Sequence, residues 1–246
     1  MQEVFAKCGA MQNLSQSSTM TNRTIAIILA RGGSKGIKKK KLIRLKNKPL
    51  IYWSIKACLK TKKISSVWVS SDSDEILKIS KKFGAKIIKR PKKFALDNSS
   101  SEQAWLHAIK FLKVKRVNPK NIVGIQPTSP IRSSKVLNKA IIKFEKKKLD
   151  SLFSAMKISN FFVWKKSKKS LKPNYDYRNR PMRQNIKEKF LENGSFYIFK
   201  SEKFLKEKCR LFGKIGYFAM NKIESLEIDD FEDLKIVKSL KVFLKD

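Results

Sequence analysis

A buried-strand pattern that stops abruptly in a glycine-rich loop constrains this chain most. Ile25 to Leu29 is a run of aliphatic and β-branched residues, typical of a strand buried on both faces of a parallel sheet. The loop Arg31 to Gly36 contains three glycines, which lack the Cβ atoms that would keep a polyanion away from backbone N–H groups. Lys35 and the run Lys38 to Lys41 add positive charge. The stretch suits a nucleoside triphosphate or, equally, a plain turn after a strand, and its spacing fits neither GxxxxGK[ST] nor GxGxxG.

The rest of the chain repeats a rhythm of strand, loop and helix. Further strands are predicted at Ile64 to Ser71, Ala85 to Lys89, Asn121 to Ile125, Ser151 to Met156, Phe190 to Lys200 and Ile215 to Met220, with a turn at Glu192 to Gly194. Helices are predicted to begin near Leu50, Glu75, Gln103, Ser134 and Phe231, the last ending near Leu244. This alternation predicts an α/β fold with a mostly parallel sheet and helices on both faces.

In such sheets, ligands bind beyond the carboxyl ends of the strands, so we expect the glycine loop, Asp72 and Arg90 to converge. The loop Asp97 to Glu102 offers hydroxyl groups, which serve equally well as a cap for the next helix. Two prolines fix the backbone of Gln126 to Arg132, where the amide of Gln126 can read a base edge.

The net charge raises a second class of function. Lys and Arg total 57 against 20 Asp and Glu, a formal +37, which suggests nucleic acid or an anionic membrane as a partner. The alternative is that the excess, mostly lysine spread along the chain, covers solvated faces. A hydrophobic content of 41% excludes a disordered chain, and no apolar run approaches the ~18 residues of a membrane span.

Between Lys157 and about Asn185 the rhythm breaks into an aromatic and basic segment. Its aromatic residues are Phe161, Phe162, Trp164, Tyr175 and Tyr177, and its arginines are Arg178, Arg180 and Arg183. Apolar residues without core periodicity predict an excursion that packs against another chain. Aromatic residues interleaved with arginine can instead bind single-stranded nucleic acid.

Glu227 and Asp229 alternate along an extended segment, so we expect both carboxylates on one side, where Mg²⁺ carrying phosphate oxygens fits. Three distant cysteines, Cys8, Cys58 and Cys209, predict a reducing compartment and no metal site. Residues 1–22 are polar and predict a disordered leader before a domain at 23–246.

Six blocks in one order resemble the acylneuraminate cytidylyltransferases, also called CMP-sialic acid synthetases. They are LARGGSKGI at 29–37, SSDSDEI at 70–76, RPKKFALDNSSS at 90–101, QPTSPIR at 126–132, RQN with ENGSFYI at 183–198, and EID at 227–229. The resemblance runs from about Thr24 to Lys238. It implies a three-layer, Rossmann-like sheet of nucleotidyltransferase type, with 157–185 as the dimerisation arm of a cytoplasmic homodimer.

The resemblance also implies a reaction. A nine-carbon 2-keto sugar acid, whether sialic, legionaminic, pseudaminic or another, attacks the α-phosphorus of CTP with Mg²⁺ as cofactor, releasing pyrophosphate. Such activated sugars serve lipopolysaccharide or capsule biosynthesis, with no membrane or specific nucleic acid as partner. The alternatives are a basic nucleic-acid-binding protein and an inactive relative, the latter motivated by Lys38, Lys41 and Glu227, where the family usually has proline, asparagine and aspartate.

The resemblance assigns roles residue by residue. The nucleotide side takes Arg31, Gly32, Ser34, Lys40, Lys41, Arg90, Ser99 and Ser101, and the sugar side takes Gln126, Arg183, Gln184 and Phe190. Asp229 and Glu227 would hold the metal, and the catalytic set is Arg31, Lys40, Arg183 and Asp229. Vertebrate relatives have arginine where Met182 stands, so Arg183, with Arg180, would supply that charge.

Overall fold

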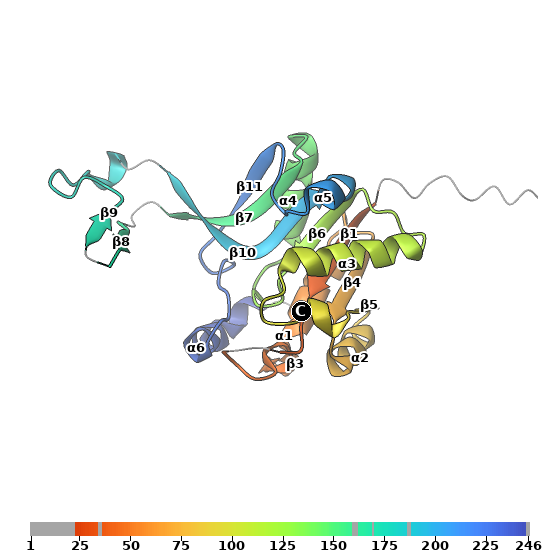
Figure 1. Ribbon diagram of the computed structural model, residues 1–246. Helices are drawn as coiled ribbons and strands as arrows, with labels where there is room; N and C mark the ends of the chain where they lie inside the picture. The colour runs from red at the N-terminus through yellow and green to blue at the C-terminus, as the bar shows by residue number, and fades with distance from the viewer. Residues whose placement is uncertain (1–22, 34–35, 159–161, 169, 186–187, 245–246) are drawn as a thin grey trace, which may run out of the picture.

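The computed structural model describes residues 23–33, 36–158, 162–168, 170–185 and 188–244. Its frame is a seven-stranded sheet in the order β11-β7-β10-β6-β1-β4-β5 (Figure 1). The strands are β1 (Thr24–Leu29), β4 (Ser66–Ser71), β5 (Lys86–Lys89), β6 (Asn121–Ile125), β7 (Ser151–Ile158), β10 (Lys189–Lys200) and β11 (Ile215–Met220). Only β10 runs antiparallel to its neighbours within this sheet, which confirms the predicted mostly parallel arrangement.

Helices cover both faces of the sheet, as a three-layer α/β fold requires (Figure 1). On one face lie α1 (Leu50–Leu59), α2 (Asp74–Lys82) and α4 (Ser134–Lys146), and on the other lie α3 (Ser101–Val114) and α5 (Ser201–Glu207). Strand β1 shows why: Ile25 and Ile27 pack with α3, while Ala26 and Ile28 pack with α1. Alternate side chains of a strand point to opposite faces, so the continuous apolar run buries both.

A third apolar cluster attaches the C-terminal helix α6 (Phe231–Ser239) to the first half of the chain. Leu234 and Val237 of α6 join Ile37 and Leu45, the latter from the small hairpin of β2 (Arg44–Leu45) and β3 (Lys48–Pro49). Helix α6 ends at Ser239 and a short 3₁₀ turn, Lys241–Phe243, follows, so the predicted helix to Leu244 was too long.

The turn predicted at Glu192 to Gly194 is wrong, because these residues lie inside the continuous strand β10. The register of β10 against β7 shifts between Glu192 and Tyr197, and Gly194 has a φ of +63°. The buried Arg132 holds this bulge: its Nη1 donates to the carbonyl oxygen and the Oγ of Ser195, both at 2.8 Å. A glycine at positive φ is as typical of a bulge as of a turn, so the sequence did not separate them.

The aromatic segment leaves the body between β7 and β10 and ends in a separate two-stranded hairpin (Figure 1). The hairpin consists of β8 (Trp164–Lys166) and β9 (Leu171–Pro173), followed by the 3₁₀ turn Arg183–Asn185. On either side of the hairpin, the rings of Phe162 and Tyr175 lie 4.2 Å apart. The predicted leader, residues 1–22, lies outside the described part of the chain, in which no helix is long and apolar enough to cross a membrane.

Candidate functional site

The carboxyl ends of three parallel strands of the sheet, β1, β5 and β6, open onto one cavity of about 280 Å³. Six residues predicted from the sequence line it: Arg31, Lys41, Arg90, Ser99, Ser101 and Gln126. Residues of the loop after each strand thus meet at the position where open α/β sheets bind ligands. Ser100 beside them is the N-cap of α3, accepting from the N–H of Gln103, so the predicted cap is confirmed and the binding role of Ser99 and Ser101 stays a prediction.

The cavity concentrates positive charge. Burial first, and then the neighbouring Lys40 and Arg31, lower the pKa of Lys41 to about 8. Arg90 is buried, which lowers its pKa to about 10, and its guanidinium donates to the carbonyl oxygen of Ser70 at 2.5 Å. Arg31 reaches Asp97 Oδ1 at 2.9 Å on the opposite wall. Preorganised cations in a partly dehydrated cavity stabilise a bound polyanion strongly.

The glycine loop touches two acidic groups. The N–H of Gly32 donates to Asp72 Oδ1 at 2.8 Å, and Asp72 acts electrostatically on Arg90, which confirms the expected convergence. A Cβ atom on Gly36 would lie 2.5 Å from the carbonyl oxygen of Asp229, whereas one on Gly33 would meet nothing within 4 Å. Gly36 therefore permits contact between the first loop and residues 227–229, here called the acidic segment. Ser34 lies outside the described residues.

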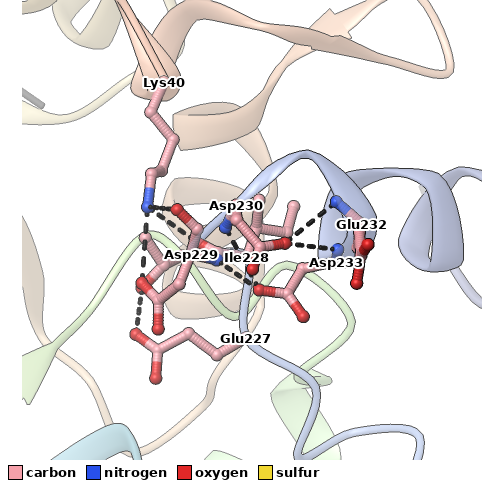
Figure 2. A network of polar contacts seen from close by, with 8 residues as sticks. Lys40, Glu227, Ile228, Asp229, Asp230, Glu232 and Asp233 are labelled. Carbon is pink, nitrogen blue, oxygen red and sulfur yellow. Dashed lines mark hydrogen bonds and ion pairs between the residues drawn. The ribbon is translucent and has the colours of Figure 1, made fainter. Parts of the chain in front are cut away.

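Lys40 fastens the acidic segment to the glycine loop (Figure 2). Its ammonium donates to the carbonyl oxygens of Ile228 and Asp229, both at 2.9 Å, and lies 3.3 Å from Asp229 Oδ1. Lys40 is 7% exposed, and its three donors are directed to this segment rather than into the cavity, which Lys41 lines instead. The predicted contact between Lys40 and the triphosphate stays a prediction.

Ile228 explains how the acidic pair is held. Its side chain is completely buried beside Ile37 and Leu45, and its N–H donates to the carbonyl oxygen of Thr128 at 2.9 Å. With the middle residue turned inward, Glu227 and Asp229 both face away from the apolar cluster, although the segment belongs to no strand of the described sheets (Figure 2). Burial, aided by the charge of Asp229, raises the pKa of Glu227.

The two carboxylates suit a hard divalent cation. Mg²⁺ typically takes one or two carboxylates and fills its other positions with water and substrate phosphate. Among the described residues no group of three or more His, Cys, Asp or Glu could form a complete protein cage. Burial and the charge of Asp229 disfavour the ionised form of Glu227, which its raised pKa reflects. A divalent cation bound there would favour that form.

A second cavity, of about 410 Å³, adjoins the first at Glu227. It is lined by Met156, Leu191, Glu192, Asn193, Gly194, Tyr197, Ser225 and Glu227. Glu227 Oε1 accepts a 2.7 Å hydrogen bond from Thr128, which lines the first cavity. A Cβ atom on Gly194 would lie 3.5 Å from both Glu227 Oε2 and Gln126 Nε2. A cationic cavity and a polar cavity thus share one acidic boundary.

The family model for cytidylyltransferases matches residues 25–245. The chain belongs to the cytidylyltransferase family. It is 38% identical over 209 residues to N-acylneuraminate cytidylyltransferase A of Danio rerio, covering 83% of this chain and 47% of that protein. It is 28% identical over 224 residues to the pseudaminic acid cytidylyltransferase of Campylobacter jejuni serotype O:23/36, covering 89% and 96%.

Solved structures agree on the fold. The structure of CMP:2-keto-3-deoxy-manno-octonic acid synthetase complexed with CTP aligns with a TM-score of 0.68 at 15% identity, covering 90% of this chain and 99% of the other. The chain spans about half the length of two N-acylneuraminate cytidylyltransferases that it matches, from Danio rerio and Oncorhynchus mykiss, at 47% of each.

Gln184 and Phe190, two of the predicted sugar-side residues, line neither of these two cavities. Gln184 is exposed in the projecting segment, and the ring centroid of Phe190 on β10 lies 4.1 Å from that of Tyr217 on β11, with the two rings tilted. Arg183 begins the 3₁₀ turn of that segment. Their assignments stay predictions, whereas Tyr197 and Glu192, which the sequence analysis did not select, line the second cavity. Their signal was present in the block ENGSFYI, but nothing in it indicated a bulge.

A larger cavity lies elsewhere in the described part. It measures about 900 Å³, lies against α1 and α4, and is bordered by Trp53, Ile131 and Phe243. Several lysines and the single carboxylate Glu224 line it, and Glu224 is already bonded to Ser133. The residues that line the two smaller cavities therefore suit a substrate site better than those that line this larger one.

Proposed function

We propose that this cytidylyltransferase transfers CMP from CTP to a nine-carbon 2-keto sugar acid and releases pyrophosphate. The observation that carries the proposal is the shared boundary: Glu227 separates a cavity lined by Arg31, Lys41 and Arg90 from a polar cavity lined by Tyr197. The relatives named for N-acylneuraminate and pseudaminic acid support an acidic nine-carbon sugar. The choice between these sugars depends on groups that face the second cavity.

In the proposed reaction the nucleotide occupies the first cavity. Arg31, Lys41 and Arg90 bind the triphosphate, and the N–H groups of the glycine loop offer further donors. Gln126, at the junction of the two cavities, is placed to contact a nucleobase or the sugar acid.

The sugar acid occupies the second cavity, beside Tyr197 and Glu192. Its anomeric hydroxyl forms a new bond to the α-phosphorus in line with the departing pyrophosphate, whose bond to that phosphorus breaks. The carboxylates of Glu227 and Asp229 provide oxygens that can accept the hydroxyl proton. The arginines and lysines offset the charge that develops on the leaving oxygens, so rate enhancement comes from positioning and electrostatics.

We propose Asp229, with Glu227, as the ligands of Mg²⁺. When bound, this ion supplies charge neutralisation to the phosphate oxygens. Lys40 holds the main chain of the ligand-bearing segment in place through its two carbonyl contacts. This is a positioning role that a lysine buried to 93% can fill without touching substrate.

We further propose a cytoplasmic homodimer. The projecting hairpin of β8 and β9 and the residues just after it carry exposed aromatic side chains, with Trp164 at 44% and Tyr177 at 55% exposure. A second copy of the chain could cover them. Cys58 and Cys209 are both free thiols, as a reducing compartment favours. The exposed lysines of α2, such as Lys78, Lys81 and Lys82, lie on its outer face and account for part of the net charge without nucleic acid.

Pyrophosphate release tests the proposed function. The protein is incubated with CTP or UTP and with N-acetylneuraminic, legionaminic or pseudaminic acid, with Mg²⁺ or with EDTA. We expect release that requires CTP, one of these acids and Mg²⁺ together. Release that is absent with every acid, or equal for UTP and CTP, would contradict the proposal.

A further inference from the structure

Arg210 contacts Glu102, next to the serines that line the first cavity, and Tyr197, which lines the second. It lies in the loop after α5 and forms a bidentate pair with Glu102 in the first turn of α3: Nε is 2.5 Å from Oε1 and Nη2 is 2.9 Å from Oε2. Both side chains are only 22% exposed. Two parallel charge-assisted bonds fix the guanidinium in direction as well as in position.

The same guanidinium lies over two aromatic rings. Its Cζ is 4.8 Å from the ring centroid of Tyr197 and 5.0 Å from that of Trp105. Trp105 is completely buried in α3, and its ring abuts Gly124 of β6, where a Cβ atom would lie 2.6 Å from it. Arg210 is therefore clamped between α3 and β10, with a rigid indole as the floor.

Each end of this contact belongs to a different cavity. Glu102 directly follows Ser99, Ser100 and Ser101, which line the cationic cavity. Tyr197 lines the polar cavity, and its hydroxyl donates to Glu192 Oε1 at 2.5 Å. The contacts Glu102–Arg210, Arg210–Tyr197 and Tyr197–Glu192 form a continuous path from one cavity to the other.

Charge supports this geometry. Burial of Glu102 opposes its ionisation, yet the bonds from Arg210 hold the pKa of Glu102 below its ordinary value. Burial and the neighbouring Glu192 raise the pKa of Tyr197, so its hydroxyl stays protonated and remains a donor. Glu102 and Tyr197 thus keep the ionisation states that their contacts need near neutral pH.

We propose that Arg210 is a positioning residue that sets the serine turn of the nucleotide cavity and Tyr197 of the sugar cavity in a fixed register. This inference rests on the proposed function. In-line transfer depends on the distance between the two reactants, and a small misplacement can lower the rate by about 100-fold. A guanidinium that contacts both walls is suited to hold that distance, and lysine cannot replace its planar fork.

The test compares Arg210→Lys and Arg210→Met with Arg44→Met, a matched control at an exposed arginine of β2. We expect both Arg210 variants to lower kcat about tenfold or more while the exposed control stays within about twofold. The Lys variant keeps the charge and much of the volume, so it also serves if the Met variant unfolds. Thermal unfolding of each variant gives the share due to stability.

A double-mutant cycle separates positioning from folding. Glu102→Gln and Tyr197→Phe are combined in the wild-type and in the Arg210→Lys background, and kcat/KM for the sugar acid is measured. With Arg210 present, we expect the effect of the double change on kcat/KM to differ about fivefold from the product of the two single effects. With Arg210→Lys, we expect the two to agree within about twofold. Active Arg210→Lys protein with wild-type kcat and KM, or equal coupling in both backgrounds, would overturn the inference. Wild-type protein without CTP turnover would instead contradict the proposed function.

Discussion

Lys40 donates to the main-chain carbonyl oxygen of Asp229 at 2.9 Å, across a separation of 189 residues in the chain. This partly buried contact joins the loop after the first strand to the acidic segment before the last helix, and the companion contact with the carbonyl oxygen of Ile228 is buried. It places the proposed metal ligand beside the cationic cavity. A lysine can thus belong to the site through the backbone that it holds rather than through the substrate.

Removing this contact should destabilise the protein. In Lys40→Met, the carbonyl oxygens of Ile228 and Asp229 lose their donor in a buried setting, so we expect the free energy of unfolding to fall by about 2–4 kcal/mol. Urea denaturation measures it. Lys39→Met removes only the exposed pair with Glu75 and should cost less than about 1 kcal/mol. Equal losses in the two variants would argue against the anchoring role.

Two glycines of the first loop should tolerate alanine differently. In Gly36→Ala the new methyl group would lie 2.5 Å from the carbonyl oxygen of Asp229, so the acidic segment must shift. We expect a loss of stability of about 1–3 kcal/mol and lower turnover. Gly33→Ala meets nothing within 4 Å and should stay within about 0.5 kcal/mol of wild type. Thermal unfolding and pyrophosphate release compare them, and an intact Gly36→Ala enzyme would contradict the close approach.

Asp229 should matter through its charge. Asp229→Asn keeps the shape of the side chain but weakens binding of Mg²⁺, so we expect at least a 100-fold loss of turnover, part of which excess Mg²⁺ restores. Glu232→Gln, an exposed carboxylate of α6 whose side chain accepts none of the hydrogen bonds drawn in Figure 2, is the matched control. Wild-type activity in Asp229→Asn would remove this residue from the metal site.

Lys41 should make the free energy of unfolding rise with pH while the affinity for CTP falls. Its pKa of about 8 in the folded protein lies below its ordinary value of 10.5. Between these values the unfolded state binds more protons, so the contribution of Lys41 to the free energy of unfolding rises with pH. CTP binding prefers the ammonium form, so affinity for CTP should fall as pH rises through about 8. Titrations at pH 7 and 9 should show this fall in wild type and Lys39→Met, but a flatter response in Lys41→Met.

The projecting hairpin should control self-association. Replacing Trp164 and Tyr177 by serine removes exposed aromatic surface without opening the core, so we expect the proposed dimer to dissociate while the Tm stays nearly unchanged. Light scattering gives the mass. Val114→Ser, an 81% exposed residue at the end of α3, is the control. A monomeric wild-type protein would refute the proposed homodimer.

Much of this fold follows from local sequence. The apolar run Ile25 to Leu29 predicts a strand buried on both faces, and the serine before α3 predicts its cap, because both signals depend on neighbours along the chain. The meeting of the glycine loop with Asp72 and Arg90 followed from parallel strands sharing one edge, whereas Lys41 was assigned only through the family resemblance.

Other features depend on distant partners. Gly194 fits a turn and a bulge equally, and only Arg132 on another loop, bonding to Ser195, selects the bulge. The neighbouring lysines Lys40 and Lys41 look alike in sequence, yet one is turned to the acidic segment and the other to the cavity. Arg210 gave no sequence signal, because its partners Glu102 and Tyr197 come from separate elements.

Calorimetric titration of CTP, in the presence of Mg²⁺, tests most directly whether the cavity beyond β1, β5 and β6 is the nucleotide site. Wild-type protein and Arg44→Ala, a change at an exposed arginine of β2, are compared with Arg31→Ala, whose side chain lines that cavity. The account predicts one CTP per chain for the first two proteins and at least a tenfold higher Kd for Arg31→Ala. No uptake of CTP by the wild type, or an unchanged Kd in Arg31→Ala, would contradict it.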